Sequence, residues 1–335
     1  LKIYQAAKAA IRPEIAAMQR TAKALAALDC LTGLSRAALK DRYVRPQITN
    51  SREGRISIHD GRHPMVEHAL KREMFVPNDT ELNHTDQEMI IITGPNMAGK
   101  STYMRQVAVL TIMAQTGSFI PAKSASFAPV DRIFTRVGAA DDISTGQSTF
   151  MVEMKEVSHI LCNATKNSLI LLDEIGRGTS TYDGMSIARA VVEYLNAKVH
   201  AYTLFATHYH ELSDMAAENE HIKNYTVTVK ERGKEITFLR RIVPGSADKS
   251  YGIHVARLAG LPESLLKRAD EILEGLEVEG IKEEPAAPVI RRETALNLFS
   301  SPIIDELADL DVMSKTPIEA MEILFRLSKE AKEGR

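Results

Sequence analysis

A glycine-rich stretch that ends in a lysine and a serine is the part of this sequence best suited to chemistry. Residues 94–101 read Gly-Pro-Asn-Met-Ala-Gly-Lys-Ser and follow the apolar run 89–93. Glycines let backbone N–H groups curl around an anion, and the helix expected after the loop points the positive end of its dipole at phosphate groups. We therefore predict that Lys100 reaches the β- and γ-phosphates of a nucleotide and that Ser101 binds Mg²⁺. The predicted nucleotide-binding residues of this stretch are Gly94, Pro95, Asn96, Met97, Ala98, Gly99, Lys100, Ser101 and Thr102.

Two adjacent carboxylates follow another apolar run, residues 169–172. Catalytic groups of a parallel sheet collect at the carboxyl ends of its strands, which would place Asp173 and Glu174 near the glycine-rich loop. Nucleotide hydrolysis depends on positioning and charge stabilisation, so one carboxylate for the metal and one for the attacking water suffice. We predict that Asp173 lies beside Mg²⁺ and that Glu174 polarises the water.

Two further polar sites are expected around the nucleotide. His208 follows the apolar run 202–207 and is a candidate to hydrogen-bond the γ-phosphate, with His210 as the competing candidate. Residues 141–150 form a polar, glycine-containing turn that leads into a helix, which gives a second helix N-terminus able to accept a phosphate. Because one nucleotide hardly needs two such helix ends from one chain, we expect a second subunit to complete the site.

The elements that must position these residues follow a strand, loop, helix pattern from residue 88 to 244. Such alternation predicts an α/β fold with a mainly parallel sheet covered by helices on both faces. Residues 225–230 and 235–243 flank a polar turn and predict a hairpin. Earlier in the chain, residues 55–58 alternate like a strand, and the stretch after them is polar and rich in turn residues.

Helical patterns flank this region. An alanine-rich pattern covers residues 1–45, and two short helices are expected over 251–276 with a break at 260–262. Residues 277–301 carry charge runs and few apolar residues, a composition that cannot bury a core and therefore predicts a flexible linker. A small helical unit is expected over 302–335.

Composition limits the class of protein. A length of 335 residues suggests about two domains. The net charge of −2 argues against binding phosphate backbones along the whole surface. Two cysteines cannot make a disulfide framework, which favours a reducing cytoplasm, and no apolar run approaches the roughly 20 residues that cross a bilayer. The chain opens at Leu1 inside a helical pattern, so we expect it to be part of a longer protein.

Several long motifs occur in order along the chain. They are TGPNMAGKSTYMRQ (93–106), RIFTRVGAADD (132–142), STFMVEM (148–154), LLDEIGRGTSTYDG (171–184) and FATHYHEL (205–212). Together they resemble the ATPase domain of the bacterial MutS family of DNA mismatch repair proteins, which belongs to the ABC class of ATPases. The resemblance covers essentially the whole chain and implies an ABC-type P-loop ATPase with ATP and Mg²⁺ as cofactors.

The resemblance also implies roles for single residues. His208 would be the switch histidine, with a catalytic role beside Lys100 and Glu174. Ser148 would reach the γ-phosphate of ATP bound to the partner subunit, and residues 177–183 would cross between the two sites. Phe75 stands where the family places an aromatic ring against the adenine.

Domain organisation and function follow from the same resemblance. The implied function is to bind and hydrolyse ATP in a dimer and thereby to switch the grip on DNA and recruit partners. The implied partners are a second copy in a homodimer, or further copies in a tetramer through the C-terminal unit, mismatched double-stranded DNA held by the full-length protein, MutL and the sliding clamp. The implied location is the cytoplasm, in association with the nucleoid and not with a membrane. The implied units are the end of a lever region (1–45), the ATPase domain (46–248), a helix-turn-helix dimer contact (249–276), the linker (277–301) and a C-terminal helical oligomerisation unit (302–335).

A short peptide in the predicted linker suggests the clamp as a partner. Residues 295–299 read Ala-Leu-Asn-Leu-Phe and resemble the pentapeptide by which bacterial proteins dock on the sliding clamp. Ala295 replaces the usual leading glutamine, so we expect weak docking carried by Leu298 and Phe299.

Other functions stay open at this point. Another DNA-associated ABC-class ATPase, or a transporter subunit, usually carries a signature of the LSGGQ type, whose Ser-Gly-Gly is missing around residues 144–148. A module that binds nucleotide without turnover is disfavoured by Glu174. A MutS paralogue that carries a nuclease domain and is not dedicated to mismatch repair is disfavoured by the helical pattern of residues 302–335.

Overall fold

The structure is a computed structural model. It describes residues 1–50, 54–70, 74–95, 98–138, 148–232, 235–246 and 251–280. The predictions for Asn96, Met97, the turn at 141–147 and everything beyond residue 280 fall outside these ranges. The chain divides into two compact units, Leu1–Asp270 and Glu271–Arg335, and the strands that the structure describes all belong to the first.

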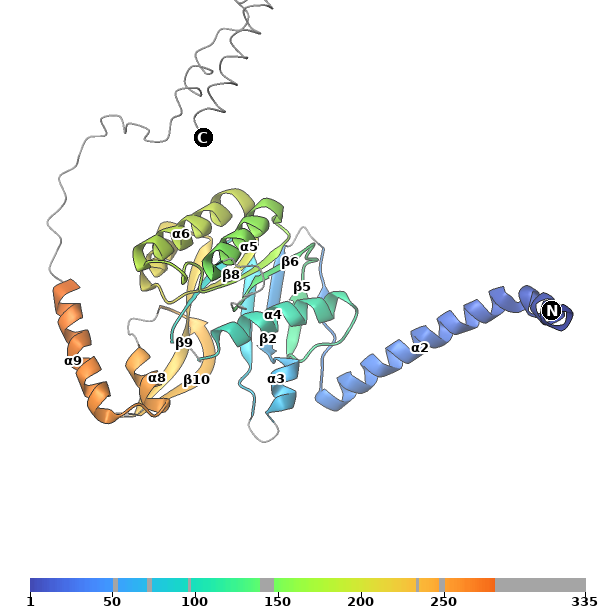
Figure 1. Cartoon of the computed structure of the whole chain (residues 1–335), viewed down its shortest axis with the longest axis horizontal. Coiled ribbons are helices and arrows are strands. Elements are labelled where there is room, and N and C mark those ends of the chain that lie inside the picture. Colours follow the sequence, from blue (N-terminus) through green and yellow to red (C-terminus); the bar gives the residue numbers. More distant parts are fainter. Residues whose placement is uncertain are drawn as a thin grey trace, which may run out of the picture. The chain divides into compact units, whose positions relative to one another are not determined.

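A six-stranded sheet contains the predicted apolar runs (Figure 1). Its strands are β4 (Met89–Thr93), β6 (Ile133–Arg136), β7 (Leu169–Asp173), β8 (Tyr202–Ala206), β9 (Ile222–Arg232) and β10 (Glu235–Pro244). In the order β10-β9-β4-β8-β7-β6, all neighbours pair in parallel except β10 and β9, which are antiparallel. The sheet is therefore mainly parallel, as predicted, and β9 and β10 form the predicted hairpin.

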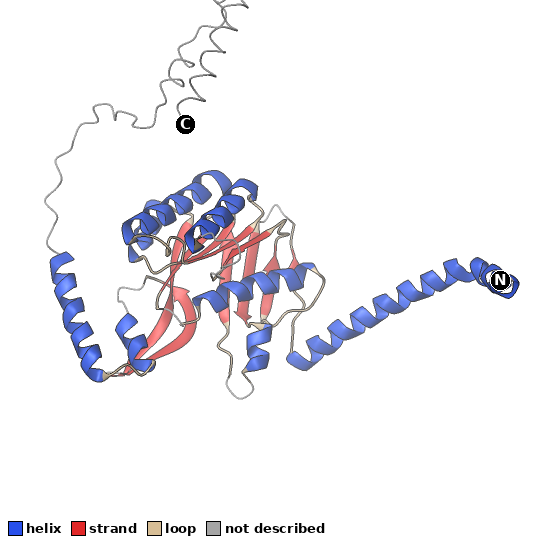
Figure 2. Cartoon of the chain, in the orientation of Figure 1, coloured by secondary structure: helices blue, strands red, loops and turns tan. Residues whose placement is uncertain are grey.

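Side chains of the central strands alternate between two hydrophobic cores. Ile90 and Leu171 belong to one core, and Ile91 and Leu172 belong to the other. This alternation follows from the strand geometry, in which successive side chains point to opposite faces. Both faces are covered, which explains why these strands are continuous apolar runs. The covering helices are α4 (Lys100–Gln115) on the first core and α5 (Thr149–Asn163) and α6 (Thr181–Tyr194) on the second (Figure 2).

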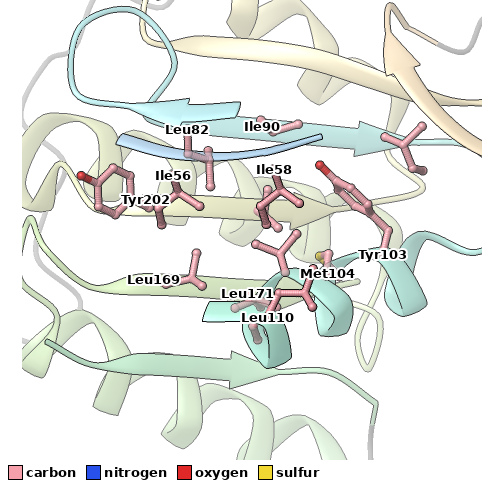
Figure 3. Packing of buried hydrophobic residues seen from close by; sticks show 14 of the residues in the cluster. Ile56, Ile58, Leu82, Ile90, Tyr103, Met104, Leu110, Leu169, Leu171 and Tyr202 are labelled. Atoms are coloured by element: carbon pink, nitrogen blue, oxygen red, sulfur yellow. The ribbon is translucent and has the colours of Figure 1, made fainter. Parts of the chain in front are cut away.

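A second, four-stranded sheet packs on the first core. Its strands are β1 (Gln47–Ile48), β2 (Arg55–Gly61), β3 (Asn78–Asn83) and β5 (Ser124–Phe127), in the order β1-β5-β2-β3. β2 pairs antiparallel with both β3 and β5, whereas β1 and β5 are parallel. Ile56, Ile58 and Leu82 of this sheet gather with Leu171 of the large sheet and Met104 of α4 (Figure 3).

Strand β3 corrects the interpretation of its region as only turn-rich and polar. Its inward side chains are Asn78, Thr80 and Leu82, all at most 4% exposed. The two polar side chains are satisfied internally, because Asn78 accepts the Ile242 N–H at 2.7 Å and Thr80 bonds the Tyr103 hydroxyl at 3.0 Å. A strand that buries polar residues gives no hydrophobic alternation in the sequence.

The flanking helices lie where the sequence predicted them. Neither α1 (Lys2–Ile11) nor α2 (Ile15–Asp41) has a buried residue, although all their residues are described, so alanine-rich local propensity accounts for them. The break between α8 (Gly252–Leu258) and α9 (Glu263–Gly280) contains Gly260 at φ +86°. α9 continues four residues into the predicted linker range.

The remaining short elements complete the described chain. These short elements are η1 (Arg12–Glu14), α3 (Pro64–Ala69), η3 (Leu195–Val199), η4 (His210–Asp214) and α7 (Met215–Glu218).

None of the helices that the structure describes is long and apolar enough to span a membrane.

Candidate active site

The glycine-rich loop joins the end of β4 to the start of α4. Gly94 and Gly99 have φ values of +130° and +104°, which residues with side chains rarely adopt. Lys100 is only 4% exposed, and its ammonium donates to the carbonyl oxygens of Gly94 and, at 3.1 Å, of Pro95. Burial lowers the pKa of this amine, and the negative charge of Glu174 acts against that shift. The lysine therefore lies over the loop, where phosphate oxygens could replace the two carbonyl oxygens as acceptors of hydrogen bonds from its ammonium.

The two predicted magnesium ligands lie together. Asp173 ends β7, and burial raises the pKa of its carboxyl, while a hydrogen bond from Ser101 acts against this rise. Mg²⁺ commonly takes one or two protein oxygens and completes its shell with phosphates and water. Within the described ranges, no group of three or more His, Cys, Asp or Glu side chains is arranged to hold a metal. The Ser101 hydroxyl and the Asp173 carboxylate are oxygens of the kind that Mg²⁺ takes beside a bound phosphate.

Glu174 opens onto the same space as the loop. A cavity of about 350 Å³ is lined by Lys100, Ser101, Glu174 and Arg177 among others. Glu174 has a φ of +55° and forms an ion pair with Arg177. Its backbone N–H donates to the Ala206 carbonyl of β8 at 2.9 Å, which ties this turn to the neighbouring strand. The structure thus brings the predicted phosphate-binding cation and the predicted water-activating carboxylate into one cavity.

A second cavity, of about 170 Å³, adjoins the first. Gly99 and Thr102 line both cavities, so the two cavities are neighbours at the start of α4. Phe75 lines the second cavity, at the position where an adenine-binding aromatic was expected. The arrangement therefore offers an apolar ring beside the glycine-rich loop.

Two further residues of the second cavity gave no signal in the sequence. Arg240 reaches it from β10, where it has a φ of +56° inside a break of the strand register. Gln106 reaches it from α4; it is fully buried, and neither of its amide atoms has a hydrogen-bond partner within the part of the chain that the structure describes. A strand bulge and an unpaired amide are products of tertiary packing, so a sequence pattern does not mark them.

The charges of Glu174, Arg177 and Lys100 act on the imidazole of His208. Burial lowers the pKa of its imidazole, and the charge of Glu174 acts against this shift. His210 begins η4 and is exposed, as His208 is, so the choice between the two histidines stays a prediction. Burial also lowers the pKa values of His63 and His84 elsewhere in the chain.

Ser148 is the N-cap of α5, the second predicted helix N-terminus. Its hydroxyl accepts the Met151 N–H at 3.2 Å, and its side chain is exposed. The other free N–H groups of the first turn can bind an anion. Ser148 is not among the described residues that line the cavity around Lys100. Its predicted role toward a partner's nucleotide stays a prediction.

The fold and the loop define a class of protein, the α/β proteins that carry a glycine-rich loop between a parallel strand and the helix that follows it. A family model described as MutS domain V matches residues 90–277, more than half of the chain. A DNA mismatch repair protein MutS from Acetivibrio thermocellus is 51% identical over 333 residues, which cover 96% of this chain and 38% of that protein. The MutS proteins of Caldicellulosiruptor bescii and Methanococcoides burtonii are 54% and 52% identical over 96% and 95% of this chain.

This chain belongs to the MutS family of DNA mismatch repair proteins. It spans 38% of the length of these relatives.

Proposed function

We propose that this chain binds ATP and Mg²⁺ and hydrolyses ATP, as the ABC-type P-loop ATPase part of a DNA mismatch repair protein. The observation that carries this proposal is the cavity lined by Lys100, Ser101 and Glu174. It combines a buried cation, a hydroxyl and a carboxylate at the N-terminus of a 16-residue helix, which is where phosphates bind. The adjoining cavity with Phe75 offers a place for the base.

Each side chain would contribute a separate part of the reaction. The loop N–H groups and Lys100 stabilise charge on the β- and γ-phosphates as the bond between them breaks. Ser101 and Asp173 would hold Mg²⁺, which supplies further positive charge to the phosphates. Glu174 orients and polarises the attacking water, and its ion pair with Arg177 keeps the carboxylate at the cavity. His208 would bond the γ-phosphate and so distinguish ATP from ADP.

A second copy of the chain is proposed to complete each site. The exposed N-cap of α5 offers Ser148 and free backbone N–H groups to the γ-phosphate of a partner. The helices α8 and α9 would supply a dimer contact, and residues 302–335 a contact for larger assemblies. ATP would then switch the dimer between two grips on DNA and promote MutL recruitment in the longer protein. The relatives carry the name DNA mismatch repair protein, which supports this role. We propose with it a location in the cytoplasm, in association with the nucleoid.

Two variants with different expected behaviour test the proposal. Lys100→Ala removes a cation from the phosphates, so ATP affinity and turnover should both fall at least about tenfold. Glu174→Gln keeps the shape of the side chain and removes the carboxylate, so ATP should still bind while hydrolysis slows at least about 100-fold. Glu193→Gln, at an exposed ion pair on α6, is the matched control and should hydrolyse ATP at the wild-type rate.

The measurements are nucleotide-binding titrations and steady-state phosphate release. A Glu174→Gln variant that hydrolyses ATP at the wild-type rate would exclude Glu174 as the water-activating residue. A wild-type chain that fails to bind ATP in the presence of Mg²⁺ would overturn the proposal as a whole.

A further inference from the structure

Two buried side chains hydrogen-bond the backbone of Gly176, two residues after Glu174, and hold it as a clamp. The backbone N–H of Gly176 donates to the Glu153 carboxylate at 2.6 Å. The Tyr209 hydroxyl donates to the Gly176 carbonyl oxygen at 3.2 Å. Glu153 and Tyr209 are each 5% exposed. Glu153 comes from α5 and Tyr209 from the segment after β8, so the two sides of the clamp are supplied by different elements.

The turn between these side chains is closely packed. Gly176 has a φ of +88°, and a Cβ built on it would lie 2.4 Å from the carbonyl oxygen of Gly184 in α6. A Cβ on Gly178 would lie 2.9 Å from the Cβ of Phe150 in the first turn of α5. The backbone that follows Glu174 therefore lies directly on both helices, with no room for a side chain at either glycine.

Glu153 is itself held in place by an arginine at the end of β6. Arg136, which is 7% exposed, approaches the second carboxylate oxygen of Glu153 at 3.4 Å and pairs with Glu156 at 2.9 Å. A buried ion pair adds little to net stability, because desolvation offsets the attraction between the charges. What this pair does provide is a fixed carboxylate acceptor for the Gly176 N–H.

Neither clamp residue is placed to touch a nucleotide. Glu153 and Tyr209 are not among the described residues that line the cavity around Lys100 or the one around Phe75. Glu174, by contrast, lines the first cavity from a backbone with φ of +55°, a conformation that costs free energy unless the surroundings hold it. After the Glu174 N–H and the fully buried Ile175 side chain, the backbone of Gly176 is a further fixed point along the chain.

We propose that Glu153 and Tyr209 are positioning residues for the hydrolytic step, because they clamp the backbone N–H and C=O of Gly176 and thereby fix the direction of the Glu174 carboxylate. The inference rests on the proposed role of Glu174 in activating water. Loosening the clamp changes the orientation of a catalytic group without changing the phosphate-binding loop. The expected consequence is a loss of turnover with little change in ATP binding, since small displacements of a reacting group cost rate.

The test uses Glu153→Gln and Tyr209→Phe in the complete 335-residue chain. Each variant should lower kcat by about tenfold or more and leave KM and the ATP dissociation constant within about twofold of the wild type. The matched controls are Glu88→Gln and Tyr202→Phe. Both change buried side chains, 6% and 1% exposed, at the amino ends of β4 and β8, away from the clamp. The controls should keep the wild-type kcat.

Hydrogen exchange of the Gly176 amide supplies a readout that does not depend on catalysis. In Glu153→Ala, which removes the acceptor, this amide should exchange at least about tenfold faster than in the wild type, while the core strands stay protected. A kcat within about twofold of the wild type in both variants, or a loss of ATP affinity as large as the loss of kcat, would overturn the clamp. If the wild-type chain does not hydrolyse ATP, the proposed function fails, and the exchange rate of Gly176 then decides the clamp alone.

Discussion

A side chain at Gly184 of α6 would have no room, so Gly184→Ala is expected to lower the free energy of unfolding. A Cβ at this position would lie 2.1 Å from the carbonyl oxygen of Gly176 and 2.5 Å from the Tyr209 hydroxyl. In an unhindered helix, Gly→Ala stabilises by about 1 kcal/mol. Overpacking here costs about 1–3 kcal/mol, and loss of the Tyr209 hydrogen bond costs about 1 kcal/mol more. We therefore expect Gly184→Ala to lower the free energy of unfolding by about 1–3 kcal/mol.

Thermal and urea unfolding followed by circular dichroism measure this change. The melting temperature of the ATPase fold should fall by about 2–4 °C for each kcal/mol. Gly33→Ala in α2 is the control, because a Cβ on Gly33 meets nothing within 4 Å. The control variant should not lower the unfolding midpoint. If Gly184→Ala unfolds at or above the wild-type midpoint, the close approach of α6 to the turn is not as tight as these distances require.

Three further predictions concern activity, pH and a partner. Mixing Lys100→Ala chains with Ser148→Arg chains should restore ATPase activity, because each mixed dimer keeps one intact site built from both chains. If proven heterodimers recover no activity, the site is not shared between chains. Because burial lowers the pKa of three histidines including His84, the unfolded chain binds more protons, and melting temperature should fall as pH drops through about 6.5. His84→Gln should reduce that pH dependence, measured by thermal melts between about pH 7.5 and 5.5. A peptide of residues 295–299 should bind a bacterial sliding clamp weakly. Changing Leu298 and Phe299 to Ala should abolish that binding without affecting ATPase activity. If clamp binding is unchanged in the double variant, the peptide is not a clamp-binding motif.

Local sequence alone was enough to predict the glycine-rich loop and the strands around it. The spacing of Gly94, Gly99 and Lys100 is enough to predict a phosphate-binding role, because a loop of this kind can bind an anion with its own backbone and with the helix that follows it. That role stays a prediction. The runs ending at Asp173 and before His208 are continuous apolar segments, a pattern that buried parallel strands produce without help from distant residues. For the same reason the order of strands and helices along the chain could be predicted.

Only the tertiary structure decided what surrounds that loop. Asn78 and Arg240 are 162 positions apart in the sequence and are joined by a hydrogen bond of 3.1 Å, which only the packing of the two sheets makes possible. β3 stayed hidden because its buried polar residues resemble a surface segment until their partners are known. The clamp on Gly176 stayed hidden for the same physical reason: Glu153 and Tyr209 are ordinary polar residues in the sequence, and only folding brings their carboxylate and hydroxyl to the backbone of one residue.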